Sequence, residues 1–345
     1  MIKTLTSWRG IFALCIVCFH FEMLEFAQMT YCGVLFFFMV SGFLTALYPH
    51  KLQGFYRRRL WRIFPLHWLT LAGMIVLDLA LMHKFKYGWD LALHVTLLQS
   101  WSPSTAIHYG YSIHSWFLSS LLACIIATPI LMRWIEKSSL RQIWIVSVLA
   151  CTVLIVVCYL IEDPWFSYTY ICPVTRIIDY TLGMALATTI TRLDLRQKME
   201  HISLANASLL ELMTLAVGAA FIVLHLGNHP VTTKLENAPL WWIPAMLLIT
   251  TCTLLNGHEG LIGKILTSKI LFWLGSISFE IYILQKLVNN TFIYVVAPIF
   301  GHYGIIVYEQ SLFFCLPLII VTSWIVHQLF TKPIAKLMNN KMSKK

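Results

Sequence analysis

The sequence predicts an all-α protein, a polytopic membrane helix bundle of about ten transmembrane helices. Of its 345 residues, 59% are hydrophobic and 12% are charged, whereas charged residues make up about a quarter of a typical soluble domain. The mean hydropathy is +0.74. Apolar runs long enough to cross a hydrocarbon core of roughly 30 Å recur along the whole chain. Because no internal repeat or separate soluble segment interrupts them, we expect a single integral membrane domain over residues 1–345.

The expected helices follow one another along the chain, and the longest connection between them is residues 83–112. The first apolar run has some features of a signal peptide, but Arg9 stands at its edge and no small-residue cleavage site follows. We therefore expect a retained first span. The later runs are assigned as helices because a spanning segment in lipid must satisfy its own backbone hydrogen bonds. The ten expected spans are residues 8–25, 31–49, 64–82, 113–132, 142–160, 173–191, 208–226, 240–256, 270–297 and 303–330.

The basic residues indicate the topology. The formal net charge of +10 would suit a nucleic-acid partner, but the basic residues lie in short clusters between apolar runs, so we expect none. If the first span enters from the cytoplasm, the segments on that side hold 20 of the 25 Lys and Arg residues. This distribution follows the positive-inside rule and predicts that both termini are cytoplasmic.

The nine cysteines do not form a recognisable site. Most lie within apolar runs, where cysteine behaves as a small hydrophobic residue. Cys15 and Cys18 precede His20, but no second ligand pair completes a metal site, so we expect no metal. Cys32 and Cys172 both approach the expected outer face, and the sequence leaves a disulfide between them open.

The first span contains the residues that most clearly suggest chemistry. On an α-helix, the eleven residues from Arg9 to His20 place them about 16 Å apart along the axis and within about 20° of the same face. Arg9 would then lie near one membrane surface and His20 about halfway through the hydrocarbon core. An ionisable residue at that depth is a candidate functional residue, although a histidine there can also be a satisfied polar contact.

A second basic element comes just before the third span. Its arginines are spaced so that at least three guanidinium groups converge on one helix face, and guanidinium binds phosphate oxygens in a bidentate way. The alternative is that they only set topology and contact anionic lipid headgroups. Together with the first span they fit an acyl donor with an anionic head and a long arm, such as acyl-CoA. The element comprises Arg57, Arg58, Arg59 and Arg62.

These patterns occur together in a known family. The chain resembles the acyltransferase-3 family of integral membrane acyltransferases, which in bacteria O-acetylate or otherwise O-acylate cell-surface sugars. The most specific match is Arg9 with His20, followed by Gly33, Phe36, Phe37, Phe38, Ser41, Gly42, Phe43 and Leu44 in the second span, and by Arg62, Ile63, Pro65 and Trp68. Weaker matches are Trp116, Phe117, Leu118 and Ser119, then Arg176 with Gly183, and Gly275 and Ser278 with Tyr282.

The resemblance implies a reaction. His20 would be the catalytic base, and Arg9 with the arginines of residues 57–62 would handle the donor, acetyl-CoA or another acyl-CoA as co-substrate, with no further cofactor. The acceptor would be a hydroxyl of a cell-surface glycan, such as a lipopolysaccharide or polysaccharide, or of a lipid-linked sugar. The protein would be a multi-pass protein of a bacterial inner membrane, in contact with membrane lipid. Direct transfer and an acyl-His20 intermediate both stay open.

The chain departs from the family pattern at three places. Leu121 and Leu122 stand where many members have a glutamate, Gln285 where many have a histidine, and Thr6 where many have an aspartate. Those acid and histidine positions are therefore not essential to the chemistry assigned here.

The remaining candidates each have a structural alternative. Ser41 either packs helices closely or approaches the acyl arm. Arg176 and Asp179 either neutralise one another as an i,i+3 pair or hold a sugar group. Glu280 and Tyr282 would orient His20 or the acceptor, and Trp68, Trp116 and Ser119 are further residues assigned to the acceptor side. Asp78, His225 and His327 are expected to be structural or interfacial.

A transporter or flippase for a glycan or anionic solute is the alternative function. In that case Arg9, His20, Arg176 and Asp179 would line a permeation path. Transporters often have two similar halves with paired broken helices, and the sequence has neither feature. The oligomeric state stays open.

Overall fold

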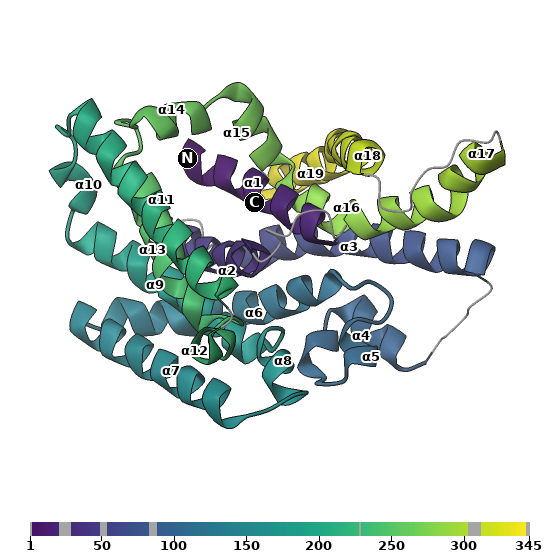
Figure 1. Cartoon of the computed structure of the whole chain (residues 1–345), viewed down its shortest axis with the longest axis horizontal. Helices are drawn as coiled ribbons and strands as arrows, with labels where there is room; N and C mark the ends of the chain where they lie inside the picture. The colour runs from purple at the N-terminus through teal and green to yellow at the C-terminus, as the bar shows by residue number, and fades with distance from the viewer. Residues whose placement is uncertain are drawn as a thin grey trace. The chain divides into compact units, whose positions relative to one another are not determined.

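The computed structural model describes residues 2–20, 29–48, 54–82, 88–227, 229–302 and 312–342, and these residues form helices and connections with no strand (Figure 1). Six described helices are long and apolar enough to cross a membrane: Phe55–Ala80, Ser115–Lys137, Leu140–Leu160, Leu204–Leu226, Ser278–His302 and Phe314–Met338. Cys32–Leu47 and Pro239–Leu254 are shorter apolar helices. The predicted class, a polytopic helical membrane protein, is confirmed.

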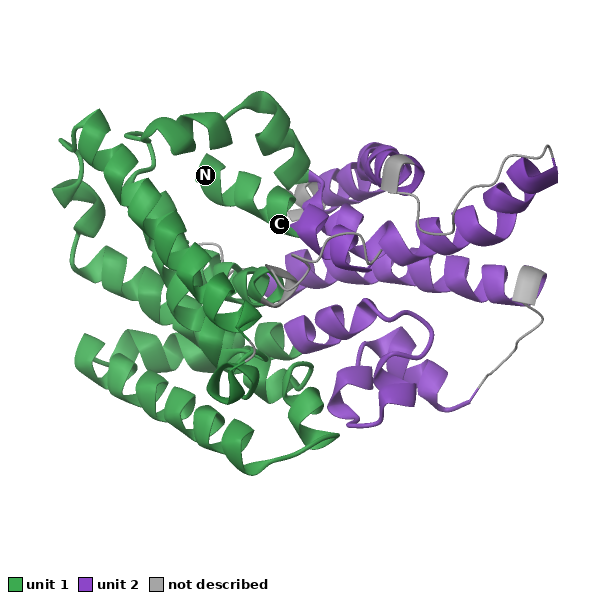
Figure 2. Ribbon diagram, viewed as in Figure 1, with its two compact units in different colours: residues 1–12, 28–53, 123–276 green, residues 13–27, 54–122, 277–345 purple. Residues whose placement is uncertain are grey.

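Nine of the ten expected spans each correspond to a largely helical segment where the structure describes them, whereas the ninth, residues 270–297, is divided at Ile277 between Lys269–Ser276 and Ser278–Thr291. Residues 21–25 of the first expected span, residue 49 of the second and residues 303–311 of the tenth lie outside the described residues. The chain gathers into two compact units, each built from three separate segments (Figure 2). The prediction of a single domain stays a prediction.

Unit 1 comprises residues 1–12, 28–53 and 123–276. Its helices include the first part of α1 (Lys3–His20) and most of α6 (Ser115–Lys137). The others are α2 (Met29–Leu47), α7 (Leu140–Leu160), α8 (Trp165–Thr169), α9 (Pro173–Arg192), α10 (Leu195–Lys198), α11 (Leu204–Leu226), α12 (Pro230–Thr233), η5 (Pro239–Trp241), α13 (Trp242–Leu254), α14 (Leu261–Leu266) and α15 (Lys269–Ser276).

Helices α2 and α9 form the centre of unit 1, and two glycines allow them to approach closely. A Cβ atom on Gly183 would collide with the carbonyl oxygen of Met39, and one on Gly42 would collide with that of Tyr180. Small residues at such positions are typical of close helix pairs in membranes. The core around this pair is formed by fully buried side chains, including Phe36, Phe43, Trp241 and Ile249.

Unit 2 comprises residues 13–27, 54–122 and 277–345. It contains the end of α1 and the start of α6. Its other helices are α3 (Phe55–Leu77) with the π-helical turn η3 (Asp78–Met82), α4 (Asp90–Thr96), η4 (Gln99–Trp101), α5 (Thr105–His108), α16 (Ser278–Thr291), η6 (Phe292–Val296), α17 (Ala297–His302), α18 (Leu312–Val326), η7 (His327–Thr331) and α19 (Lys332–Met342). Helix α16 packs against both α3 and α18.

The close approach of α2 and α9 predicts the effect of one added methyl group. Gly183→Ala must push α2 away from α9, and overpacking of this kind costs about 1–3 kcal/mol or more. We expect a lower thermal unfolding temperature for this variant in detergent. Gly218→Ala on α11 is the matched control, because nothing lies within 4 Å of its added Cβ atom and alanine favours the helix. Equal unfolding temperatures for the two variants would contradict the prediction.

Candidate active site

His20 is the last residue of α1, and its side chain is exposed. Because α1 is continuous from Lys3, Arg9 and His20 lie on one helix, as the sequence predicts. Arg9 is half-buried. It lies in the part of α1 assigned to unit 1, whereas His20 lies in the part assigned to unit 2. An exposed imidazole at the end of an apolar helix is accessible to a substrate.

The ring of His20 packs edge-to-face against the ring of His114, with centroids 4.3 Å apart and an interplanar angle of 83°. His114 immediately precedes α6 and is only 2% exposed. On the other side, the ring of Phe19 lies 5.2 Å from that of His20. The two imidazoles therefore form a pair with one exposed and one buried member.

Helix α16 supports this pair. The Tyr282 hydroxyl donates a hydrogen bond to the backbone carbonyl of His114 (3.2 Å), and the two rings lie 5.8 Å apart. Lys286 follows one helical turn later, and its charge acts on both imidazoles. We call His20, His114, Tyr282 and Lys286 the imidazole cluster.

The start of α6 is fixed by the short helices that precede it. The backbone N–H of Ser100 donates to the Ser119 hydroxyl (3.1 Å), and the Ser100 hydroxyl donates to the carbonyl of Trp116 (2.8 Å). The Gln99 amide also donates to the Ser115 hydroxyl (3.0 Å). Trp116 and Ser119 are buried. These contacts set the position of the α6 start, and with it that of His114.

The arginine element forms the first two turns of α3. Arg57, Arg58 and Arg59 are half-buried and Arg62 is exposed. The Arg59 guanidinium lies 5.5 Å from the Phe55 ring centroid, and that of Arg62 lies 5.8 Å from the centroid of Phe279 on α16. The amino end of the helix carries a partial positive charge, which acts together with the charges of these side chains. The element is therefore suited to bind an anion.

Glu280 does not contact His20. Its carboxylate lies 2.7 Å from Nδ1 of His327, on the π-helical turn η7, and the carboxylate is nearly fully buried. The charge of Arg62 also acts on Glu280. Trp68, one of the acceptor-side candidates, is 50% exposed, and its indole N–H donates to the carbonyl of Val95 (3.0 Å).

The remaining candidates belong to unit 1. Arg176 and Asp179 form a fully buried ion pair of 3.1 Å, which confirms the pairing that the sequence suggests. Arg176 also donates to the carbonyl of Asn237 (3.0 Å), and the indole of Trp242 donates to Asp179 (2.6 Å). The Ser41 hydroxyl donates to the carbonyl of Phe37 within α2 (2.8 Å). None of the nine cysteines forms a disulfide in this structure, so no disulfide joins Cys32 to Cys172.

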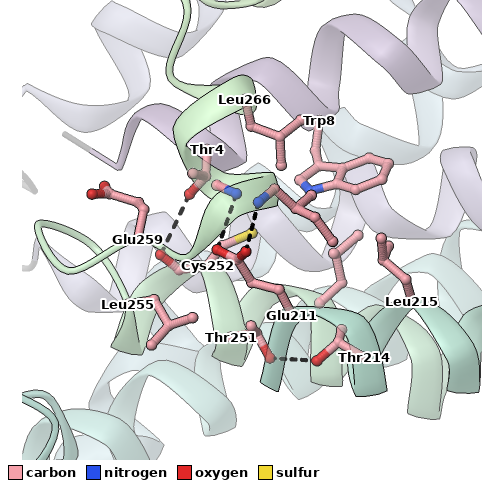
Figure 3. Close-up of a pocket in the computed structure, with 13 residues that line it drawn as sticks. Thr4, Trp8, Glu211, Thr214, Leu215, Thr251, Cys252, Leu255, Glu259 and Leu266 are labelled. Atoms are coloured by element: carbon pink, nitrogen blue, oxygen red, sulfur yellow. Dashed lines mark hydrogen bonds between the residues drawn. The ribbon is translucent and has the colours of Figure 1, made fainter. Parts of the chain in front are cut away.

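A pocket in unit 1 lies between α1, α11, α13 and α14, and Trp8 and Thr4 form part of its wall (Figure 3). Two acids, Glu211 and Glu259, line the pocket. The Glu211 carboxylate accepts hydrogen bonds from the amides of Gly260 (2.9 Å), Ile262 (3.0 Å) and Gly263 (3.0 Å), at the start of α14. Glu211 therefore caps α14.

Sequence reasoning missed two members of the imidazole cluster, His114 and Lys286. His114 was detectable as a histidine at the edge of an apolar span, two residues before the Trp116 motif. His327 is expected to be structural or interfacial, and its bond to the buried Glu280 is a contact of that kind. No local pattern in the sequence indicates Lys286.

Fold and site together define a polytopic helical membrane protein with an exposed histidine on its first helix and a cluster of arginines at the start of α3. Comparison with known proteins identifies the family. Residues 2–327 match the acyltransferase-3 family model, described as an acyltransferase domain. The chain therefore belongs to the acyltransferase-3 family, as the resemblance predicts.

One relative is acyltransferase MdmB of Streptomyces mycarofaciens, 28% identical over 275 residues. The alignment covers 73% of this chain and 66% of MdmB, so the chain spans just under two thirds of the length of that relative. No solved structure matches the chain.

The buried ion pair of α9 leads to a stability prediction. Arg176→Met leaves the Asp179 carboxylate buried without its cation, and breaking a buried pair in this way costs about 3–5 kcal/mol. We expect the double variant Arg176→Met/Asp179→Leu to unfold at a higher temperature than the single variant, because it leaves no uncompensated charge. A single variant with unchanged stability but weakened acceptor binding would instead assign Arg176 to substrate.

The short helices before α6 predict a pH dependence. His94 on α4 is buried and its Nε2 bonds to the carbonyl of Ile107 (2.7 Å). Burial lowers the pKa of His94, with the neighbouring His108 acting in the same direction, and the Ile107 bond and Asp90 opposing. The unfolded chain therefore takes up a proton first as the pH falls below about 6.5, and the free energy of unfolding decreases.

His94→Gln tests this dependence, because the amide retains a donor for Ile107 but has no titratable ring. We expect wild type to lose more stability than this variant between about pH 7.5 and pH 5.5, the window below the ordinary histidine pKa. Unfolding of both proteins in detergent measures the difference. Parallel losses would show that His94 does not contribute to acid sensitivity.

Proposed function

We propose that the protein is a membrane O-acyltransferase. It moves an acyl group, acetyl in the first instance, from cytoplasmic acyl-CoA to a hydroxyl of a cell-surface glycan or lipid-linked sugar in a bacterial inner membrane. The observation that carries the proposal is the exposed imidazole of His20 at the end of α1, in a chain of the acyltransferase-3 family.

The arginines of α3 supply the donor site in this proposal. Arg57, Arg58, Arg59 and Arg62 lie at the amino end of a long helix, where side-chain charge and helix dipole both favour phosphate. Tyr56 and Trp61 in the same turns are exposed aromatic side chains. Ser41 is assigned to the acyl arm, although its hydroxyl already bonds within α2.

His20 acts as a general base in the transfer. The acceptor hydroxyl gives its proton to His20 as its oxygen attacks the thioester carbonyl carbon. A C–O bond forms, the C–S bond breaks, and the leaving CoA thiolate takes the proton from the His20 imidazolium. Atoms and charge balance without any further reactant. Transfer through an acyl-His20 intermediate is the alternative route.

In this proposal Arg9 helps to bind the acyl donor. It lies on the same helix as His20, eleven residues earlier, so it is assigned to the charged or polar part of the donor that precedes the thioester. If its guanidinium reaches the thioester, it also stabilises the oxyanion.

Trp68 and Tyr282 are the acceptor-side residues of the proposal, since Trp68 is half-exposed and Tyr282 belongs to the imidazole cluster. The other acceptor-side candidates, Trp116, Ser119, Arg176 and Glu280, are buried, and their bonds support a role in holding the protein's own elements.

Acyl transfer from radiolabelled acetyl-CoA into surface glycan tests the proposal in membranes containing wild type or variants. We expect His20→Ala to reduce labelling by at least about 100-fold, because a positioned base contributes typically 100- to 10,000-fold. Arg59→Ala should mainly raise the acetyl-CoA concentration needed for half-maximal labelling, by about tenfold, as expected for loss of a charged hydrogen bond of roughly 1.5–3 kcal/mol.

Arg141→Ala is the matched control, because Arg141 is an exposed arginine at the start of another spanning helix. It should leave labelling unchanged. Label retained on the protein of denatured wild type but not of His20→Ala would favour the acyl-histidine route. A folded His20→Ala variant that labels glycan as well as wild type would overturn the proposed function.

A further inference from the structure

His114 has an unusual environment for a buried histidine. Its side chain is 2% exposed, yet neither ring nitrogen has a hydrogen-bond partner among the described residues. Leaving a buried polar group without a hydrogen-bond partner destabilises the folded protein by at least as much as one hydrogen bond between neutral groups contributes. Such groups are therefore rare in native proteins and call for an explanation. The other buried histidines of unit 2 among the described residues each bond a backbone carbonyl, His67 and His94 through Nε2 and His108 through Nδ1.

The contact of His114 suggests when its nitrogens acquire a partner. Its ring lies against His20, with centroids 4.3 Å apart. At rest both rings are neutral in the reaction proposed above, and no hydrogen bond joins them. When His20 takes the acceptor proton it becomes an imidazolium with two N–H donors. The new N–H faces the departing thiolate, and the N–H already present on the other nitrogen becomes a charged, stronger donor that gains more from an acceptor.

The residues around His20 and His114 increase the need of charged His20 for a hydrogen-bond acceptor. Lys286 on α16 is the charged group that acts on both imidazoles, and its positive charge opposes a second positive charge on His20. The Tyr282 hydroxyl, also on α16, bonds the His114 backbone and leaves the ring nitrogens free. Among the residues that the structure describes, no carboxylate acts on His20. Within this described part of the chain, a neutral ring nitrogen of His114 is the nearby acceptor.

We propose that His114 is a positioning residue for His20: an unprotonated ring nitrogen of His114 accepts a hydrogen bond from the His20 imidazolium that forms during acyl transfer. This inference rests on the proposed function. A hydrogen bond from a charged donor is roughly twice as strong as one from a neutral donor. The bond therefore stabilises the transition state, in which His20 gains charge, more than the resting enzyme, and it favours turnover rather than donor binding.

The transfer remains balanced with His114 included. The acceptor proton moves to one nitrogen of His20, and the N–H on the other nitrogen points to His114 without leaving His20. The C–O bond forms, the C–S bond breaks, and the proton taken by His20 passes to the CoA thiolate. His114 begins and ends neutral. His114 is buried and His20 is exposed, so His20 is the imidazole assigned to the acceptor hydroxyl.

Substitutions of His114 distinguish a hydrogen bond to His20 from packing against its ring. His114→Phe keeps a flat ring against His20 but has no acceptor, whereas His114→Gln places an amide oxygen near the original nitrogen. Both are compared with wild type and His20→Ala in membranes that contain their own surface glycan, with radiolabelled acetyl-CoA as the donor. His225→Phe on α11 is the matched control, since His225 is a buried histidine of unit 1.

We expect His114→Phe to lower kcat by about 10- to 100-fold, the effect of losing one charged hydrogen bond, with the KM for acetyl-CoA within about twofold of wild type. The acid limb of its pH–rate profile should move to lower pH, because His20 then holds its proton less firmly. His114→Gln should recover part of kcat and part of the shift in the acid limb. His225→Phe should change none of these quantities.

A folded His114→Phe variant with wild-type kcat and pH profile would overturn the proposal. Equal losses in the Phe and Gln variants with an unchanged acid limb would also overturn it, because they would indicate packing alone. If the Phe variant does not fold, His114→Leu replaces it in the comparison with Gln. Absence of transfer by wild type would contradict the proposed function, whereas His20-dependent transfer that is insensitive to His114 would contradict only this inference.

Discussion

The hydrocarbon interior requires every backbone N–H and C=O of a spanning segment to bond within the protein, which leaves the α-helix as the element available here. Chemistry must then come from side chains at helix ends and helix contacts. His20 ends α1, the arginines begin α3, and His114 directly precedes α6. His20, His114 and the arginines therefore lie at the bounds of the described helices, whereas Tyr282 and Lys286 of the same unit lie within α16.

Much of the fold follows from local patterns. The apolar runs predict the spans because the bilayer fixes their length, and the common helix of Arg9 and His20 follows from one uninterrupted run. The pairing of Arg176 with Asp179 was predictable for the same reason, since i,i+3 residues are neighbours on any helix. Patterns of this kind depend on a few consecutive turns, and the sequence contains them directly.

Contacts between distant segments were not predictable in this way. His20 and His114 are 94 positions apart and Glu280 and His327 are 47 apart, so no periodicity connects them. Ser119 is similar: its motif suggests an acceptor site, but its hydroxyl bonds an amide from the loop before α6. Such pairings depend on how connections fold back over helix ends, and several chain paths are compatible with the same hydrophobic pattern.

The start of α14 has an evolutionary consequence. Glu211 of α11 occupies the place where a serine or aspartate of the helix itself normally caps the first amides. Side chains at Gly260 and Gly263 would meet its carboxylate oxygens. Neither the acid nor the glycines can therefore change alone without loss of the cap or a clash. Glu211, Gly260 and Gly263 are therefore expected to change together in evolution. A related protein that lacks the acid would need a capping residue at the start of α14 itself.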